Sequence, residues 1–300
     1  MLAQPHRDSL ALLIEQEQTR VQELLGVRHS RMAVTPFTYF RGAAIVMASD
    51  LAQKPHSGQM VQLCGDAHIL NFGFYASPER QLLFDINDFD ETFPGPYEWD
   101  VIRLATSVLL AAQSNGFGSE EQEEICVTAL RAYAQAMAEF AEMPFLAMWP
   151  SHLSRQRLVD KGGSKNLRNH LKEVVSAALK RDSRQAVKKL CEIGVDGEYR
   201  FKNDPPLIWR AEQLPESWRE KLDWDEWGPQ MFASYFKSVR PDVRHVFSHY
   251  RLVDSAIKVV GVGSVGTRCA ISLFVGQHPE SIQYSLNGLR VKFNEQLSNY

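Results

Sequence analysis

The chain has few cysteines, no long apolar run and no excess of charge of one sign. Its four cysteines lie far apart and form no Cys-x-x-Cys pair, which argues against a disulfide framework and a structural zinc site. No uninterrupted apolar stretch approaches the roughly 18 residues that a membrane-spanning helix needs. The segment from Met1 to Asp8 contains a proline and a carboxylate where a secretion signal has its apolar core. We therefore expect a cytoplasmic globular protein with no membrane partner.

The charge balance argues against a protein that grips nucleic acid over its whole surface. The 33 Lys and Arg residues nearly balance the 36 Asp and Glu residues, giving a formal net charge of -3 at pH 7. Positive charge gathers only in residues 155–189, which are either a solvated helical face or a landing surface for an anionic substrate. With 300 residues, the chain is long enough for one large domain or two modest ones.

Hydrophobic spacing predicts a helix-rich α+β fold. Apolar residues at helical spacing predict helices over residues 8–26, 99–112, 120–143 and 231–247. Short runs rich in apolar residues predict strands over residues 60–64, 82–86, 257–260 and 267–275. We expect Pro36 to break any helix around it, and the segment with Gly73 between the first two strands to form a turn.

The most informative pattern is a set of carboxylate and amide side chains that follow the first two predicted strands. Asp66 follows the first strand, Asn71 stands five residues later, and Asp88 follows the second strand. This spacing is that of a kinase catalytic loop, in which the first Asp accepts the proton of the attacking hydroxyl and the other two residues bind a divalent metal. Such hard oxygen ligands suit Mg²⁺, which offsets the charge that phosphoryl transfer spreads over oxygen atoms. The alternative is that all three are ordinary loop-capping residues.

Four neighbouring side chains have two interpretations each. Asp100 is either a helix-start carboxylate or an acceptor that braces the catalytic loop. Asp90 is either a second metal ligand or an exposed turn residue, and His68 is either a loop histidine held by the backbone or a metal ligand. Arg41 contacts either a phosphate or a surface carboxylate. We assign Asp90 to the metal, and Asp100, His68 and Arg41 to the side chains that surround the site.

A glycine-rich segment near the C-terminal end carries the pattern Gly-x-Gly-x-x-Gly. Its candidate phosphate-binding residues are Gly261, Gly263, Ser264 and Gly266. The pattern is found both at the first helix of dinucleotide-binding folds and in the loop that covers kinase phosphates. The residues from Thr267 to Val275 alternate in polarity, which predicts a strand and not a helix. We therefore expect a hairpin that covers phosphates, with a purely structural hairpin as the alternative.

Five segments together resemble one bacterial protein family, known as domain of unknown function 2252 (DUF2252). The segments are Thr35 to Ala44, Cys64 to Gly73, Phe84 to Thr92, Gly95 to Asp100 and Val260 to Arg268. The motifs of this family are similar to those of aminoglycoside and choline phosphotransferases in the protein-kinase-like superfamily. The resemblance implies a two-lobed kinase-like fold, ATP and Mg²⁺ as cofactors, and phosphate transfer to a small-molecule or protein acceptor. By motif match it gives Asp66 the catalytic role, Asn71 and Asp88 the metal, and the glycine-rich segment the phosphate-covering role.

The order of the segments is permuted relative to ordinary kinases, because the glycine-rich segment follows the catalytic aspartate. We expect an N-terminal helix in residues 1–30, a helix-rich catalytic lobe in residues 31–255, and a truncated small lobe in residues 256–300. The glycine-rich segment and the aspartate cluster are expected to enclose one triphosphate and its magnesium. Lys292 is the only nearby candidate for the lysine that contacts the phosphates.

Two other functions remain open at this stage. The first is a binding or regulatory module that holds nucleotide without turnover, which a truncated small lobe would favour. The second is a metal-dependent phosphohydrolase that would use Asp66, His68, Asp85 and Asp88, although the sequence lacks the further histidine-rich clusters of a two-metal site.

Overall fold

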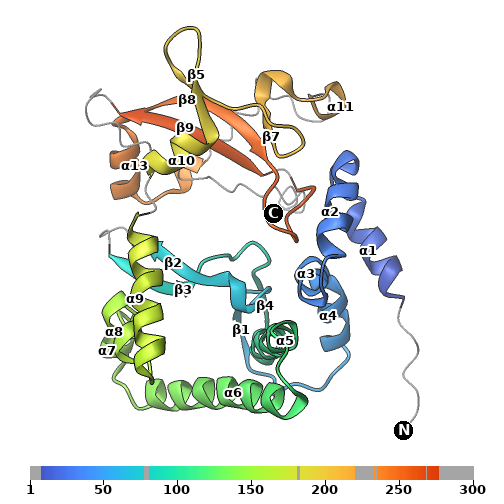
Figure 1. The fold of residues 1–300 in the computed structure, drawn as a ribbon, viewed down its shortest axis with the longest axis vertical. Helices are drawn as coiled ribbons and strands as arrows, with labels where there is room; N and C mark the ends of the chain where they lie inside the picture. Colours follow the sequence, from blue (N-terminus) through green and yellow to red (C-terminus); the bar gives the residue numbers. More distant parts are fainter. Residues whose placement is uncertain are drawn as a thin grey trace. The chain divides into compact units, whose positions relative to one another are not determined.

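The computed structural model describes residues 8–77, 81–180, 183–219, 233, 235–267 and 269–276. The chain divides into two compact units, Met1–Lys180 and Arg181–Tyr300, and each unit is described by itself. Helices dominate the first unit, and antiparallel strands form the centre of the second (Figure 1). The α+β class predicted from the sequence is therefore confirmed. The division after Lys180 lies earlier in the chain than the predicted division after residue 255.

The N-terminal part of the first unit is a set of short helices held together by a buried charged side chain. These helices are α1 (Ser9–Glu17), the 3-10 helix η1 (Gln22–Leu24), α2 (Leu25–Met32), α3 (Pro36–Gly42) and α4 (Ala44–Leu51). Arg28 is completely buried and donates hydrogen bonds to the side chains of Glu17 (3.2 Å) and Gln16 (3.1 Å) and to the carbonyl of Gly42 (2.5 Å). A buried guanidinium is tolerated here because its donors meet acceptors from α1 and α3.

The single helix predicted over residues 8–26 is wrong. Helix α1 ends at Glu17, and Gly26 lies inside α2 instead of ending a helix. Gln22 explains the break, because its side-chain amide donates to the carbonyl oxygens of Glu17 (2.9 Å) and Arg20 (3.0 Å). These are carbonyls of the kind that lose their partners when a helix ends, so the side chain compensates for the interruption.

The expectation that Pro36 interrupts helical structure is correct on one side of the residue only. Helix α2 ends before it, but Pro36 occupies the first turn of α3 and begins that helix. Thr35 and Thr38 form a reciprocal capping box around the proline, in which each side chain accepts from the other residue's backbone amide. A proline in the first helical turn costs no hydrogen bond, so here it is a start signal.

Two small antiparallel sheets carry the loops with the predicted site residues. Strand β1 (Met60–Leu63) pairs with β4 (Phe93–Pro96), and β2 (Phe72–Ala76) pairs with β3 (Leu82–Ile86). The strands predicted over 60–64 and 82–86 are confirmed, but they belong to different sheets. Strand β2 lies where the sequence predicts only a turn. Its Gly73 is a strand residue and not a turn residue, and a Cβ there would meet only the end of the Asn87 side chain, at 2.6 Å from Nδ2.

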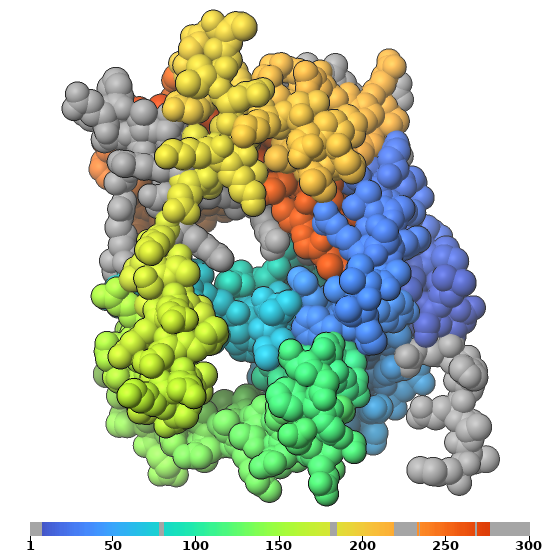
Figure 2. Space-filling view, in the orientation of Figure 1, coloured from blue at the N-terminus to red at the C-terminus, as the bar shows by residue number. Residues whose placement is uncertain are grey.

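Helix α5 (Glu98–Ser114) is the central helix of the first unit and contacts α3, α4 and α6. It and α6 (Ser119–Ala141) confirm the two helices predicted in this region. Helix α6 has no fully buried residue, and Figure 2 shows it and α9 open on the face drawn. The remaining helices of the unit are α7 (Phe145–Met148), α8 (Arg155–Asp160) and α9 (Lys165–Lys180). No helix in the described part of the chain combines the length and the apolar composition needed to cross a membrane.

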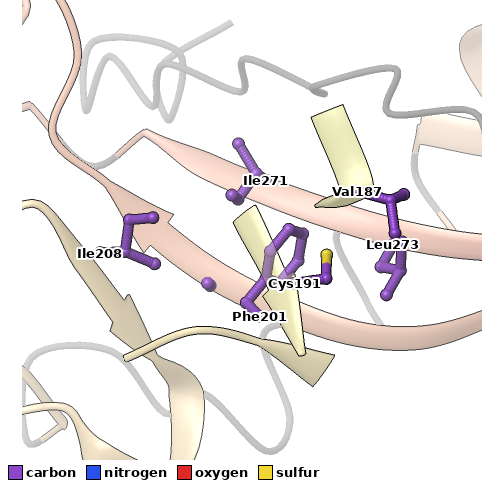
Figure 3. Packing of buried hydrophobic residues seen from close by; sticks show 7 residues of the cluster. Val187, Cys191, Phe201, Ile208, Ile271 and Leu273 are labelled. Carbon is purple, nitrogen blue, oxygen red and sulfur yellow. The ribbon is translucent and has the colours of Figure 1, made fainter. Parts of the chain in front are cut away.

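The second unit is built on a three-stranded antiparallel sheet in the order β7-β8-β9. Its strands are β5 (Cys191–Ile193), which pairs with β6 (Tyr199–Phe201), then β7 (Ile208–Arg210), β8 (Tyr250–Lys258) and β9 (Ala270–Gly276). Its helices are α10 (Ser183–Leu190), η3 (Ala211–Gln213), α11 (Glu216–Arg219) and α13 (Pro241–Phe247). Phe201, Ile271 and Leu273 lie in the core that joins α10 to the sheet (Figure 3). The helix predicted over 231–247 is interrupted, because Pro241 begins α13.

Candidate active site

The loop after strand β1 is fixed by a carboxylate from the first turn of helix α5. Asp100 accepts hydrogen bonds from the backbone amides of Cys64 (2.7 Å, to Oδ2) and Gly65 (3.0 Å, to Oδ1). Burial raises the pKa of Asp100, and the two hydrogen bonds partly oppose this rise because they favour the carboxylate. Asp66, the next residue of the loop, is therefore held from α5 through the backbone that precedes it.

Asp66 itself is bound by a buried arginine that the sequence analysis did not identify. Its Oδ1 accepts a hydrogen bond of 2.6 Å from Nε of Arg103, which is 3% exposed. Arg103 also donates from Nη2 to the carbonyl of Phe40 (2.9 Å), and its Cζ lies 3.9 Å from the centroid of the Phe40 ring. The other oxygen, Oδ2, lies 3.7 Å from Nε2 of His68, which is beyond hydrogen-bond distance. Among the described residues, Oδ2 is thus the Asp66 oxygen available to accept a proton.

Asn71 lies at the end of a single 3-10 turn, η2 (Ile69–Asn71), that follows Asp66. Its Nδ2 donates to the backbone carbonyl of Asp66 (2.6 Å), which leaves Oδ1 as the side-chain atom that can bind a ligand. The turn is fixed from α5, because the first amide of η2 donates to Oγ of the completely buried Ser107 (2.9 Å). The five-residue spacing of Asp66 and Asn71 therefore corresponds to a direct hydrogen bond between the two residues.

The loop with Asp88 and Asp90 lies against the Asp66 loop. Cys64 donates from Sγ to the carbonyl of Asp88 (3.3 Å), and Asn71 accepts at its carbonyl the amide of Asn87 (3.0 Å). Within the loop, the amide of Asp90 donates to Oδ1 of Asp88 (3.3 Å), and both residues are half-buried. Burial raises the pKa of the Cys64 thiol to about 11, and the nearby carboxylates, Asp88 among them, contribute to the rise.

The crossing of the two loops requires a glycine. Gly65 has a φ of +86°, and a Cβ at this position would lie 1.9 Å from the carbonyl oxygen of Glu91. Thr92, one residue further on, donates from Oγ1 to the carbonyl of Leu63 (2.6 Å). The residues after β1 and after β3 are therefore brought together by backbone contact.

Arg41, on α3, contacts the Asp66 loop through His68. Its Nε donates to Nε2 of His68 at 3.2 Å, and Asp66 and Asp88 both act electrostatically on its guanidinium. Burial lowers the pKa of His68, which is 2% exposed, and the Asp66 carboxylate partly opposes this. A neutral imidazole that accepts this bond at Nε2 carries its proton on Nδ1. Its Nε2 is then not available to a metal, so the metal-ligand interpretation of His68 is disfavoured.

The side chains in this region that could hold a cation are an amide and carboxylates. Within the described residues, no group of three or more His, Cys, Asp or Glu side chains is arranged to hold a metal ion. Asn71 and Asp88 offer an amide and a carboxylate oxygen, and Mg²⁺ is commonly held by one or two protein ligands together with phosphate oxygens and water. Asp85, proposed for a phosphohydrolase, lies in β3, is exposed, and accepts the amide of Ile86 (2.8 Å). Asn71 and Asp88 therefore offer oxygen donors of the type that Mg²⁺ prefers, and Mg²⁺ with a nucleotide stays a prediction.

The glycine-rich segment lies in the second unit, between strands β8 and β9. These strands pair antiparallel, so the predicted hairpin is confirmed and a helix directly after the glycines is excluded. Gly261 (φ +65°) and Gly266 (φ +86°) both adopt the left-handed conformation that favours glycine. The predicted residues Gly263 and Ser264 lie between them, and the Ser264 carbonyl accepts a hydrogen bond from Oγ1 of Thr267 (2.7 Å). Lys292 lies outside the described residues.

An apolar cavity of about 660 Å³ in the first unit shares part of its wall with the support of Asp66. Phe40 and Met47 line this cavity, and Arg103 contacts both of them, donating from Nη1 to Sδ of Met47 at 3.5 Å. Asp50 is the only carboxylate among the lining residues. The arginine that binds Asp66 is therefore packed against the wall of a cavity.

Sequence reasoning assigned Asp100 of α5 to the surroundings of the site but missed Arg103 and Ser107 on the same helix, although a signal for these two exists. Arg103 and Ser107 are four residues apart, and both are buried on α5 together with Val108 and Ala112. Residues at this spacing share one face of a helix. An arginine and a serine on an otherwise apolar helix face indicate polar partners in the interior, here the Asp66 loop and the turn η2.

The comparisons with known proteins agree with the segment resemblance described above. The profile of a bacterial family, described as "Uncharacterized protein conserved in bacteria (DUF2252)", matches residues 20–286. No curated protein and no solved structure matches the chain. The family match includes the loops of Asp66 and Asp88 and the glycine-rich hairpin. The chain therefore belongs to the DUF2252 family of bacterial proteins.

Proposed function

We propose that this protein is an ATP- and Mg²⁺-dependent phosphotransferase of kinase-like fold, which transfers phosphate to a hydroxyl group of a small-molecule or protein acceptor. The observation that carries the proposal is the direct connection of Asp66, Asn71 and the Asp88 loop. Asn71 is hydrogen-bonded to the Asp66 carbonyl, and its own carbonyl accepts the amide of the residue before Asp88. The similarity of the family's motifs to those of aminoglycoside and choline phosphotransferases supports the same chemistry.

Each side chain has a role that its contacts support. Oδ2 of Asp66 accepts the proton of the acceptor hydroxyl, while Oδ1 stays bound to Arg103, which fixes the orientation of the carboxylate. Asn71 Oδ1 and the Asp88 carboxylate would hold Mg²⁺, with Asp90 in the same turn. Bound Mg²⁺ would offset the charge that develops on the phosphate oxygens. The glycine-rich hairpin of the second unit keeps its phosphate-covering role as a prediction from the family resemblance alone.

The metal assignment is tested by the thermal stability of the full chain with and without Mg-ATP. We expect Mg-ATP to raise the Tm of the wild-type protein, because a ligand that binds only the folded state stabilises it by mass action. Asp88→Ala should remove most of this increase, whereas Asp160→Ala, a matched change at an exposed carboxylate on α8, should keep it. Equal increases in the wild type and Asp88→Ala would refute the assignment of Asp88.

Turnover is tested separately, by following ADP formation with a panel of hydroxyl acceptors. Asp66→Asn should lower turnover by at least about 100-fold while nucleotide binding persists, since a general base contributes a factor of this size. Nucleotide binding by the wild type without ADP formation for any acceptor would favour a regulatory module. Release of phosphate from a model ester without nucleotide would instead favour a phosphohydrolase.

A further inference from the structure

The neighbourhood of Asp66 contains two arginines, and one of them, Arg103, is bound within the protein through all three of its nitrogen atoms. Arg103 donates to Asp66, to the Phe40 carbonyl and to Met47, and it is 3% exposed. Each of its three nitrogen atoms thus has a partner within the first unit. Arg103 is therefore a structural support, because its guanidinium is bound within the first unit and its burial keeps the remaining N–H groups away from a substrate.

Arg41 has the opposite arrangement. Its Nε donates to His68 (3.2 Å), but no described residue accepts a hydrogen bond from its Nη1 or Nη2. His68 in turn is buried, and its backbone amide donates to the carbonyl of Asp66 (2.8 Å). The Arg41 guanidinium is thus oriented from the catalytic loop through its inner nitrogen, and its two terminal nitrogens are left to bind a ligand. It lies half-buried in the field of the Asp66 and Asp88 carboxylates.

We propose that Arg41 binds the phosphoryl group that is transferred at Asp66. This inference rests on the proposed function, and it names Arg41 as the positively charged side chain that contacts the transferred phosphoryl group. Two parallel N–H donors on a planar guanidinium match two oxygens of a phosphoryl group, which a single ammonium does not. The side chain also comes from α3, whose start is fixed by the capping box at Thr35.

The reaction balances with these groups. The acceptor oxygen forms a bond to the γ-phosphorus of ATP, and the bond from that phosphorus to the bridging oxygen breaks. The proton of the acceptor hydroxyl goes to Asp66, and ADP leaves with the electron pair of the broken bond. Negative charge spreads over the oxygens of the group in flight, and Arg41 stabilises this charge from the side of α3.

The test compares ATP with ADP, because only ATP carries the group that Arg41 is proposed to bind. Titration calorimetry on the full chain in Mg²⁺ would measure both affinities for the wild type, Arg41→Gln, Arg41→Lys and Arg131→Gln. We expect Arg41→Gln to weaken ATP binding about tenfold or more, the factor for a lost charge-assisted hydrogen bond, and to leave ADP binding within about threefold. Arg41→Lys should keep part of the ATP affinity, since it keeps the charge. Arg131→Gln, the same change at an exposed arginine on α6, should bind both nucleotides like the wild type.

The other results of the titrations would overturn either the role of Arg41 or the proposed function, and they can be told apart. Equal weakening of ATP and ADP by both Arg41 variants would mean that Arg41 only supports the shape of the site. Unchanged binding of both nucleotides would remove it from the site altogether. Failure of the wild type to bind either nucleotide would refute the proposed function, and this inference with it. Arg41→Lys keeps the test open if Arg41→Gln does not fold, because it preserves the charge beside Asp66 and Asp88.

Discussion

The sharpest structural prediction concerns Gly65, where the Asp66 loop crosses the loop of Asp88. Replacement of Gly65 by alanine places a Cβ 1.9 Å from the carbonyl oxygen and 2.5 Å from the carbonyl carbon of Glu91. Both neighbours are backbone atoms, so no side chain can rotate to make room. Either the Asp66 loop or the segment up to Glu91 must shift, and both carry proposed site residues.

Gly58 provides a matched control for the size of this effect. Its φ of +83° is close to the +86° of Gly65, but no atom lies within 4 Å of its hypothetical Cβ. Gly58→Ala should therefore cost only the left-handed backbone strain, about 1 kcal/mol. Gly65→Ala should cost this plus the displacement of packed backbone, about 2 kcal/mol more. For a domain of this size, the difference corresponds to a Tm lower by roughly 4–8 °C in Gly65→Ala than in Gly58→Ala.

The assay is thermal unfolding followed by far-UV circular dichroism, with hydrogen exchange to locate the change. In Gly65→Ala, the backbone amides of Cys64, which donates to Asp100, and of Thr92, which donates to the carbonyl of Phe89, should exchange faster than in the wild type, because both lie where the two loops cross. Gly58→Ala should leave these amides unchanged. If the two variants lose the same stability, the loops do not cross as described and the backbone contact of Gly65 with Glu91 is wrong.

Other predictions concern the supports of the fold and the buried thiols. Arg28→Met should lower the free energy of unfolding in urea by about 3 kcal/mol, the lower end for a broken buried ion pair, because the buried Glu17 loses Arg28 but keeps its contact with His29 (2.8 Å). Thr35→Ala should cost about 1 kcal/mol in the same assay, since it removes the cap of α3. The pKa of Cys64 and that of Cys191 are both raised to about 11, so at pH 8 both should react with iodoacetamide much more slowly in the folded protein than in urea. Because the folded state holds these thiols protonated, they stabilise it fully below their ordinary pKa of 9.0, and this contribution is lost as the pH rises towards 11. The free energy of unfolding in urea should therefore be lower at pH 10.5 than at pH 8. Equal free energies at the two pH values would contradict the raised pKa values.

The sequence predicts helices and strands well where they depend on the local pattern of apolar residues. It predicts them less well where a contact with a distant residue sets their bounds or their pairing. The apolar spacing in α5 and α6 and the short runs in β1 and β3 were sufficient to predict these elements. The break after Glu17 was not predictable in the same way, because it depends on Gln22 turning back to the carbonyls at the end of α1. The pairing of β1 with β4 joins segments about 30 residues apart, and periodicity carries no information about such partners.

In the candidate site, too, the features set by local sequence could be predicted, and the contacts with distant residues could not. The spacing of Asp66 and Asn71 is a local pattern, and the structure connects the two residues by a hydrogen bond. The role of Arg103 could not be predicted from local sequence, because its partners, Asp66 and Phe40, are 37 and 63 positions away in the chain. The sequence shows Arg41 as a lone cation beside small residues, and this pattern carries no information about its contact with His68.

The dependence of the Asp66 loop on one helix explains why two separated segments of the sequence act together. Asp100 and Arg103 are three residues apart on α5 and therefore lie on the same face of the helix. The first binds the backbone before Asp66, and the second binds the Asp66 carboxylate. A single rigid element thus sets both the position of the loop and the orientation of its side chain, with Ser107 one turn further on holding η2. Any change that rotates or shifts α5 must alter these three contacts at once, so the geometry of the proposed base and of Asn71 is governed by how α5 packs on α3 and α4.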